Sequence, residues 1–495
     1  MKKYILSFTL VITSLCVFSQ NDTAYIHTFG GASDEKILQI KETPGNTFIS
    51  VGYTGTYGNG NSDIYLLKTD SVCNKIWSKH IGSSGVDWGC SITPTSDNGL
   101  AIVGYTNSYG AIGYDVLLIK TDSIGEVLWQ KTFGGTDWDF GYSIKETSDG
   151  GLLIAGKTYS SGAGGADAYI IKTDNLGNLE FEKTYGGAGK EAANDIIIDS
   201  DGNYVFIGET SSSSNGQTDL LLQKINSSGD EIWTKSFGDS LNEVGYSLVQ
   251  TQDFGYAMAG YCESYSPEGD KQIYTLKADS SGNFKWQHSH GHASLPDEAK
   301  TVFELPSGQL LYSGYTSNGA GGTDVFAFIA SSGGWWTPAS ASYGSVKNEM
   351  VYSGLYASNK SFYLGGFTES PLWSSGFSDA MIIRNDTIKE RPIQYITLYD
   401  DFVLGEKERT LYSKNITIYP NPVAENTTIF FPQEIKLSEI KLVVFDVTGR
   451  LINVNEIRNN NSIDISFQNL KSGVYFVAVY FKQNSLLGTG KLIVQ

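Results

Sequence analysis

The chain has 495 residues and a formal net charge of −18 at pH 7. Such an acidic chain repels phosphate backbones and anionic lipid, so we exclude nucleic acid as a partner. Its 56 glycines and 30 tyrosines, against only 4 methionines, are typical of a turn-rich β protein.

The first residues have the pattern of an export signal. Lys2 and Lys3 precede an apolar stretch, and Val17 and Ser19 occupy the positions that a signal peptidase recognises. We predict that residues 1–19 are a signal peptide. A lipoprotein anchor at Cys16 is the weaker alternative, because lipoprotein processing requires a small residue before the cysteine and Leu15 is larger. No later segment has the ~18 apolar residues of a membrane span, so we do not expect an integral membrane protein.

A repeat of about 52 residues occupies most of the chain. An aromatic residue or its substitute followed by glycine recurs every 52 or 53 residues, at Phe29, Ile81, Phe133, Tyr185, Phe237, His290 and Tyr343. An aspartate that opens an apolar run keeps a similar step, at Asp63, Asp115, Asp167, Asp219, Asp270, Asp324 and Asp379. A fixed period of this length indicates a stacked or radial repeat. We assign residues 20–387 to seven copies of one unit.

Each unit contains four short strand-like runs. In the third unit these are residues 142–146, 152–157, 168–173 and 179–184, with Asp/Asn/Gly clusters in two of the turns. The two middle runs are almost entirely apolar, which indicates strands covered on both faces. Seven such units resemble a seven-bladed, all-β propeller with four antiparallel strands per blade. An open stack of β units is the alternative.

The two ends of the repeat favour a closed ring. Residues 23–31 match the fourth strand of a unit, although no first three strands precede them. The seventh unit, from Tyr343, supplies three strands and lacks a clear fourth. We therefore predict that the N-terminal strand completes the last blade and removes the exposed edges.

Two further segments follow the repeat. Residues 388–414 lose the period and carry charges and Pro392, so we predict a linker. Residues 415–495 alternate strand-like runs with turns at Asn421-Pro422 and Thr448-Gly449, and we predict a small β-sandwich.

Several spaced motifs stand in this last segment, at Pro420, Asn421, Pro422, Asp446, Gly449, Arg450, Gly473, Tyr475 and Lys491. With these motifs in this order, the segment resembles the type A C-terminal sorting domain of cargo for the type IX secretion system of Bacteroidetes. The resemblance implies that the type IX machinery is a partner. It also implies passage through the periplasm to a secreted or outer cell-surface location. It says nothing about the activity of the propeller.

An acidic residue follows each aromatic-glycine marker by about six positions, at Glu35, Asp87, Asp139, Glu191, Glu243, Asp297 and Glu349. Seven carboxylates around one mouth of a channel are candidate Ca²⁺ ligands, since hard cations prefer oxygen. We favour a structural role, because a residue present in every unit usually serves the unit. Each acid would then pair with a repeated lysine such as Lys79 or Lys183, or accept backbone N–H bonds. We predict no cofactor and keep Ca²⁺ as the alternative.

The second-to-third and fourth-to-first loops share one face and are the longer ones, so we expect a site there. The candidate ligand-binding residues on this face are Tyr57, Tyr109, Tyr159, Tyr265, Trp88, Trp138 and Trp373, with Asp137. Aromatic rings beside carboxylates stack on sugar faces and hydrogen-bond hydroxyls. The alternative is that these rings pack the loops together.

Familiar catalytic motifs such as GxSxG, HExxH and a phosphate-binding glycine loop are missing from the sequence. We predict a secreted or surface propeller that is a non-catalytic binding module for an extracellular glycan or protein. The alternatives are a polysaccharide-degrading enzyme that uses carboxylates on the long-loop face, whose catalytic residues we do not identify, and a structural surface protein. The ligand, the oligomeric state, release or anchoring, and the disulfide state of Cys73, Cys90 and Cys262 stay open.

Overall fold

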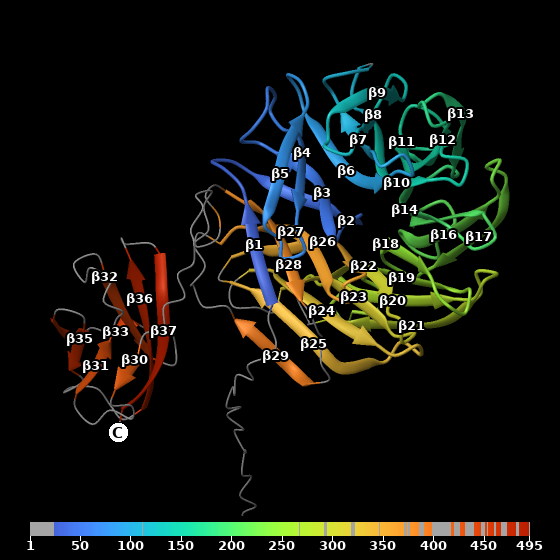
Figure 1. The fold of residues 1–495 in the computed structure, drawn as a ribbon. Coiled ribbons are helices and arrows are strands. Elements are labelled where there is room, and N and C mark those ends of the chain that lie inside the picture. Colours follow the sequence, from blue (N-terminus) through green and yellow to red (C-terminus); the bar gives the residue numbers. More distant parts are fainter. Residues whose placement is uncertain are drawn as a thin grey trace, which may run out of the picture.

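The computed structural model describes residues 24–110, 112–266, 268–291, 295–317, 322–345, 347–370, 374, 377–385 and 391–397, and the C-terminal strands between 417 and 494 with residues 454 and 459. The regular elements of this described part are all β-strands (Figure 1). Accordingly, no helix there is long and apolar enough to cross a membrane. The predicted signal peptide lies outside the described residues.

Four-stranded antiparallel sheets of the kind that form propeller blades follow the units of the sequence. Sheet 1 contains β2 (Glu35–Thr43), β3 (Thr47–Thr54), β4 (Asp63–Thr69) and β5 (Lys75–Ile81). Sheet 2 contains β6 (Asp87–Pro94), β7 (Leu100–Thr106), β8 (Asp115–Thr121) and β9 (Val127–Phe133). Sheet 3 contains β10 (Asp139–Glu146), β11 (Leu152–Thr158), β12 (Asp167–Thr173) and β13 (Leu179–Tyr185).

The next two sheets repeat this order without change. Sheet 4 contains β14 (Glu191–Ile198), β15 (Tyr204–Thr210), β16 (Asp219–Ile225) and β17 (Glu231–Phe237). Sheet 5 contains β18 (Glu243–Gln250), β19 (Tyr256–Cys262), β20 (Gln272–Ala278) and β21 (Phe284–His290).

The last two sheets involve segments from outside their own unit. Sheet 6 contains β22 (Glu298–Glu304), β23 (Leu310–Thr316), β24 (Asp324–Ala330) and β25 (Trp336–Gly344), and β29 (Arg391–Thr397) joins it parallel to β25. Thus part of the segment expected to be a linker is a strand. Sheet 7 contains β26 (Glu349–Tyr356), β27 (Phe362–Thr368) and β28 (Asp379–Asn385), and β1 (Ala24–Phe29) is its fourth strand. β1 pairs with β28 from Ala24 opposite Asn385 to Phe29 opposite Ala380.

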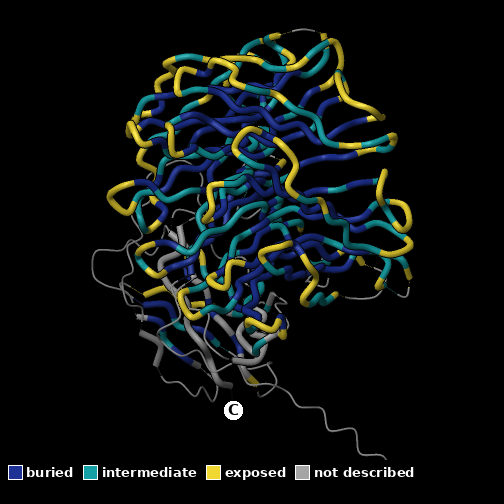
Figure 2. The backbone as a smooth tube through the Cα atoms, turned by 90° about the vertical axis from the view of Figure 1, so that its right-hand side faces the viewer, coloured by how far each residue is buried: buried dark blue, intermediate teal, exposed yellow. Residues whose placement is uncertain are grey.

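The apolar middle strands are buried on both faces. Every residue of β12 and β16 is buried, whereas β9 and β13 at the outer edge are largely exposed or half-buried. Figure 2 shows the buried strands in the interior and the exposed segments at the turns. This burial follows from sheets that pack face to face, since each face of a middle strand then meets a neighbouring sheet.

A β-bulge interrupts the first strand of each of sheets 1 to 7 at the same position, for example between Gly141 and Ser143 in β10. A bulge leaves one residue out of the ladder and redirects its side chain. These seven residues, which we call the axial residues, are Leu38, Cys90, Tyr142, Asn194, Tyr246, Lys300 and Tyr352.

The first strands lie around a common centre (Figure 1), and β2 contacts both β6 and β26. The Ile92 amide donates to Gln39 of sheet 1 at 2.7 Å, and the Ile40 amide donates to Ser353 of sheet 7 at 3.4 Å. A parallel bridge joins Ser62 to Val86, and another joins Asp34 to Ser378. Sheets 7 and 1 are therefore joined by the same types of contact as sheets 1 and 2.

The C-terminal region forms two further four-stranded antiparallel sheets. One contains β30 (Thr417–Tyr419), β31 (Asn426–Phe430), β35 (Ser462–Ser466) and β34 (Asn455–Arg458). The other contains β33 (Leu451–Ile452), β32 (Ile440–Asp446), β36 (Gly473–Phe481) and β37 (Ser485–Val494). Apolar side chains from both sheets are buried, among them Ile429, Ile463, Val444 and Val477.

Candidate ligand-binding site

The seven repeated acids, which we call the junction carboxylates, are buried in the blade-like sheets. Each of them is at most 2% exposed. Glu191 accepts hydrogen bonds from the Gly187 amide at 2.8 Å and from the Ser212 amide and the Thr210 hydroxyl at 2.9 Å. Gly187 follows the last strand of sheet 3, and Thr210 ends the second strand of sheet 4. The carboxylate therefore fastens one sheet to the next.

The glycine of each aromatic-glycine marker makes room for two buried side chains. A Cβ on Gly186 would lie 2.2 Å from Asp167 and 2.4 Å from Glu191, which is closer than any real contact. In sheet 5 the corresponding Gly291 faces Asp297 and Gln272, because Gln272 opens β20. The expectation that Asp270 holds this place in the repeat is wrong, because β20 begins two residues later, at Gln272.

The repeated lysines do not pair with the junction carboxylates. Lys79 pairs with Glu126, and Lys183 pairs with Asp230 at 2.8 Å. The junction carboxylates instead accept hydrogen bonds from backbone amides and hydroxyls of adjoining segments. Each of sheets 1 to 7 has one such carboxylate. Within the described residues, no group of three or more His, Cys, Asp or Glu side chains is placed to hold a metal ion.

Two of the predicted loop tryptophans have different environments. Trp88 is half-buried, stacks on Tyr53 with ring centroids 4.0 Å apart, and donates its indole N–H to Ser62 at 2.8 Å. Trp138 is 51% exposed and meets the ring of Tyr114 edge-on. Asp137 is exposed beside it and accepts a bond from the Trp138 amide.

The four predicted loop tyrosines also divide into packed and exposed groups. Tyr57 donates its hydroxyl to the Gly30 carbonyl, and Tyr109 packs against the core between sheets 1 and 2. Tyr159 and Tyr265 are more exposed, at 37% and 38%. Trp373 lies outside the described residues. None of these predicted residues lines the cavity at the centre of the sheets.

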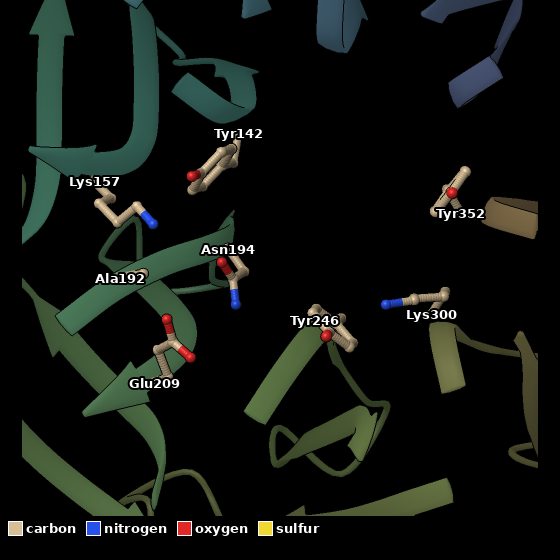
Figure 3. A pocket seen from close by; sticks show the side chains of 8 residues that line it. All are labelled: Tyr142, Lys157, Ala192, Asn194, Glu209, Tyr246, Lys300 and Tyr352. Carbon is tan, nitrogen blue, oxygen red and sulfur yellow. The ribbon is translucent and has the colours of Figure 1, made fainter. Parts of the chain in front are cut away.

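That cavity has a volume of about 270 Å³. Its lining residues come from the first and second strands of several sheets (Figure 3) and are Tyr142, Lys157, Ala192, Asn194, Glu209, Tyr246, Lys300 and Tyr352. Five of the eight are axial residues, so the bulges supply most of the wall.

A small side chain explains why the cavity opens at sheet 4. In each of sheets 1 to 7, one residue near the start of the first strand pairs with the next-to-last residue of the second strand. In order, these first-strand residues are Lys36, Trp88, Phe140, Ala192, Val244, Glu298 and Met350. Ala192 is the smallest of them and lines the cavity. In sheets 1 and 2 the equivalent space holds Tyr53, Trp88 and Tyr105, whose rings lie against one another.

Two charged residues of the cavity depart from the repeat. The penultimate residue of the second strand is aromatic in five sheets, at Tyr53, Tyr105, Tyr261, Tyr315 and Phe367. In sheets 3 and 4 it is Lys157 and Glu209. In Figure 3 the Lys157 ammonium and the Glu209 carboxylate both point into the space beside Asn194. Within the described residues, neither group forms a hydrogen bond or ion pair.

The opposite wall carries charges that are paired with one another. Glu298 forms ion pairs with Lys300 at 2.5 Å and with Lys271 at 2.8 Å. Burial opposes its ionisation, but the charges of these lysines and their hydrogen bonds lower the pKa of Glu298 to about 2. The Lys300 ammonium also lies 3.4 Å from the ring centroid of Tyr246. Both lysines of this wall are thus engaged by Glu298, although one carboxylate balances only one of their two charges.

The environment of Glu209 is different. Burial raises the pKa of Glu209, although the charges of Lys157, Lys190 and Lys271 oppose that change. Burial likewise raises the pKa of the Tyr142 and Tyr246 hydroxyls, so both stay neutral and can donate hydrogen bonds. The Asn194 amide N–H donates to the Gly245 carbonyl at 2.9 Å. The cavity thus offers donors, acceptors and aromatic rings together.

The sequence reasoning missed all eight lining residues, because it searched the loops and the cavity is made by strands. A signal was nevertheless present. The next-to-last residue of each second strand follows a glycine. When successive units are aligned on that glycine, the residue after it is Tyr105 in one unit, Lys157 in the next and Glu209 in the one after. A change from aromatic to charged at one repeat position marks these two residues.

Residues 417–495 match the family model of the secretion system C-terminal sorting domain, which confirms the resemblance found in the sequence. The chain is therefore exported by the type IX system to the cell surface or the extracellular space. Of the predicted sorting residues, Asp446, Gly473, Tyr475 and Lys491 lie on β32, β36 and β37. Pro420, Asn421, Pro422, Gly449 and Arg450 lie outside the described residues.

Similar proteins cover parts of the chain. The regulatory protein FlaEY of Caulobacter vibrioides is 27% identical over 186 residues, which are 32% of this chain and 19% of that protein. The chain thus spans about a fifth of the curated relative it matches. The structure of PorZ, a surface component of the type IX secretion system of Porphyromonas gingivalis, matches with 12% identity and a TM-score of 0.40 over 94% of this chain and 60% of PorZ. Puromycin hydrolase matches with 10% identity and a TM-score of 0.45 over 81% of this chain and 59% of the hydrolase.

Proposed function

We propose that this exported chain is a closed seven-bladed β-propeller whose central cavity binds an extracellular glycan without cleaving it. Closure is supported by β1, which pairs with β28, and by the contacts that join sheet 7 to sheet 1. Closure also leaves no sheet face without a neighbour, which suits strands that are buried on both faces.

The observation that carries the binding proposal is the combination of groups in the cavity. Tyr142, Tyr246 and Tyr352 supply rings and hydroxyls, and Asn194, Lys157 and Glu209 supply further polar groups. Sugars present apolar faces and hydroxyl rims, and such a mixed surface matches both. The volume of about 270 Å³ is just below the ~300–1,000 Å³ of common ligand pockets, so the cavity suits one unit of a longer chain.

The number of carboxylates favours binding over hydrolysis. Glycosidases of the usual type use a pair of carboxyl groups on either side of the scissile bond. Glu209 is the one carboxylate among the eight lining residues, and nearby Glu298 is bound by two lysines. A purely structural role accounts for Lys157 only through its contacts with the Phe140 and Tyr159 rings, and it gives Glu209 no hydrogen-bond donor among the described residues.

The test is binding of the full mature chain to a broad glycan array, followed by calorimetric titration of each hit. Ala192→Phe places in sheet 4 the residue that sheet 3 carries as Phe140, so it fills the cavity with a side chain that the repeat accommodates. We expect this variant to weaken binding at least ~10-fold, which is about 1.4 kcal/mol. Ile124→Ser, at an exposed turn of sheet 2, is the control that keeps binding. An array without hits, or full binding by Ala192→Phe, contradicts the proposal.

A further inference from the structure

We infer that the central cavity accepts an acidic sugar, a uronate unit whose carboxylate meets Lys157 and whose hydroxyls donate to Glu209. The inference rests on the proposed glycan-binding function and names the class of glycan. It is carried by the two residues that depart from the repeat and face the same space.

The first step concerns the cations of the cavity. Two lysines line it, and Lys300 is held by Glu298 at 2.5 Å. Lys157 forms no ion pair with any described residue and lies 5.6 Å and 5.4 Å from the ring centroids of Phe140 and Tyr159. An unpaired ammonium beside aromatic rings is available to an anionic group of a ligand. In a chain of net charge −18, such a local cation is needed before an anion can bind.

The second step concerns Glu209. Its side chain is half-buried and has no hydrogen-bond donor among the described residues, which is an unfavourable state for a charged group. Burial raises its pKa accordingly. Neighbouring hydroxyls of a sugar ring are donors of the right kind to satisfy the two oxygens of one carboxylate. Binding would then restore the solvation that burial removed.

The third step is the separation of the two groups. Lys157 and Glu209 occupy the same repeat position on neighbouring sheets, yet their charged atoms do not form an ion pair. Tyr142 and Asn194, which are the axial residues of the same two sheets, lie beside the gap (Figure 3). A ring that carries a carboxylate at one end and hydroxyls along its edge fits a gap with a cation on one side and an acceptor on the other.

The experiment titrates the full mature chain with trisaccharides of galacturonate, glucuronate and mannuronate, each beside the neutral hexose trisaccharide of the same linkage. We expect at least one uronate to bind ~10-fold or more tightly than its neutral partner, since each 1.4 kcal/mol is tenfold. Lys157→Tyr introduces the residue that sheets 1, 2, 5 and 6 carry at this position, so its fold should be preserved. This variant should lose the preference for the acidic sugar, and Glu209→Gln should weaken both sugars.

The outcomes separate this inference from the proposed function. If neutral sugars bind as tightly as uronates, and Ala192→Phe abolishes both, the cavity binds glycans but the acidic class is wrong. A preference for uronates that survives Lys157→Tyr also overturns the inference. If neither uronates nor neutral sugars bind, the inference is overturned. The glycan array then decides whether the proposed function is also wrong.

Discussion

Two sets of residues recur three positions apart in sheets 1 to 7, one at or just before the start of the first strand and one within it, and they behave in opposite ways. The junction carboxylates are always Asp or Glu, are buried, and bind amides and hydroxyls of neighbouring segments. The axial residues include Leu, Cys, Tyr, Asn and Lys. The bulge takes the axial residue out of the ladder, so packing does not dictate its type. A position that keeps its chemistry in every unit serves the fold, whereas one that varies is free for a site.

The largest expected effect breaks a junction. Glu191→Ala leaves the Gly187 and Ser212 amides and the Thr210 hydroxyl without their acceptor inside the protein. We expect a loss of about 3–5 kcal/mol in the free energy of unfolding, measured by urea titration. Asn194→Ala, three residues later on β14, should cost only about 1 kcal/mol. Equal losses for the two variants would remove the distinction between the two sets.

A pH effect is expected at Glu349. Burial raises the pKa of Glu349 to about 7, and the charge of Asp324 adds to this, although hydrogen bonds from Thr368 and Ser345 oppose it. The folded chain then holds a proton that the unfolded chain releases from about pH 4.5. The resulting stability is complete below that pH and is lost as the pH rises through about 7, by up to about 3 kcal/mol.

Glu349→Gln should remove this decline, because glutamine stays neutral at every pH. The measurement is the urea midpoint of both proteins between about pH 5 and about pH 8. Glu126→Gln, whose side chain is 67% exposed, is the control that should keep the wild-type decline. The same decline in Glu349→Gln would show that another group carries the effect.

A smaller effect tests the glycine between the carboxylates. A methyl group on Gly186 would collide with Asp167 and Glu191, so Gly186→Ala should cost about 2 kcal/mol through overpacking. Gly165→Ala is the matched control, since its nearest neighbour would be an ordinary 3.5 Å away. Thermal unfolding of the two variants distinguishes them. Equal melting temperatures for Gly186→Ala and Gly165→Ala would mean that the junction accommodates a methyl group without strain.

The smallest effect is expected at an axial residue. Cys90 is only half-buried, so this axial position should tolerate a hydroxyl in place of the thiol. Cys90→Ser should change the free energy of unfolding by less than about 1 kcal/mol. Cys262 is fully buried in the core of sheets 4 and 5, so Cys262→Ser should cost about 1–3 kcal/mol. A larger loss at Cys90 than at Cys262 would contradict the view that axial positions are tolerant.

Much of the fold could be predicted from the sequence, because it depends on the period and on runs of apolar residues. The four strands of unit three lie close to their expected bounds, and the N-terminal strand pairs with β28. The role of Gln272 was missed, since β20 begins two residues after Asp270, the aspartate that the repeat pointed to. The bulges were not predictable, because no residue type marks the position where a ladder slips.

The candidate site was much harder to predict than the fold. Lys157 and Glu209 each stand next to the terminal threonine of a strand whose other residues are apolar, and nothing in one unit shows that their side chains face a common space. Their meeting depends on neighbouring sheets that arrange the same repeat position around a centre. The loop aromatics were visible, but Trp88 and Tyr109 proved to pack against neighbouring residues.

The most direct test of the central claim is a crystal structure of the full mature chain with its tightest-binding oligosaccharide. The account predicts one sugar unit in the central cavity, within hydrogen-bond reach of Lys157 and Glu209 and against the rings of Tyr142 and Tyr246. A ligand bound instead to the exposed loop residues Trp138 and Tyr159, with the central cavity empty of sugar, would contradict it.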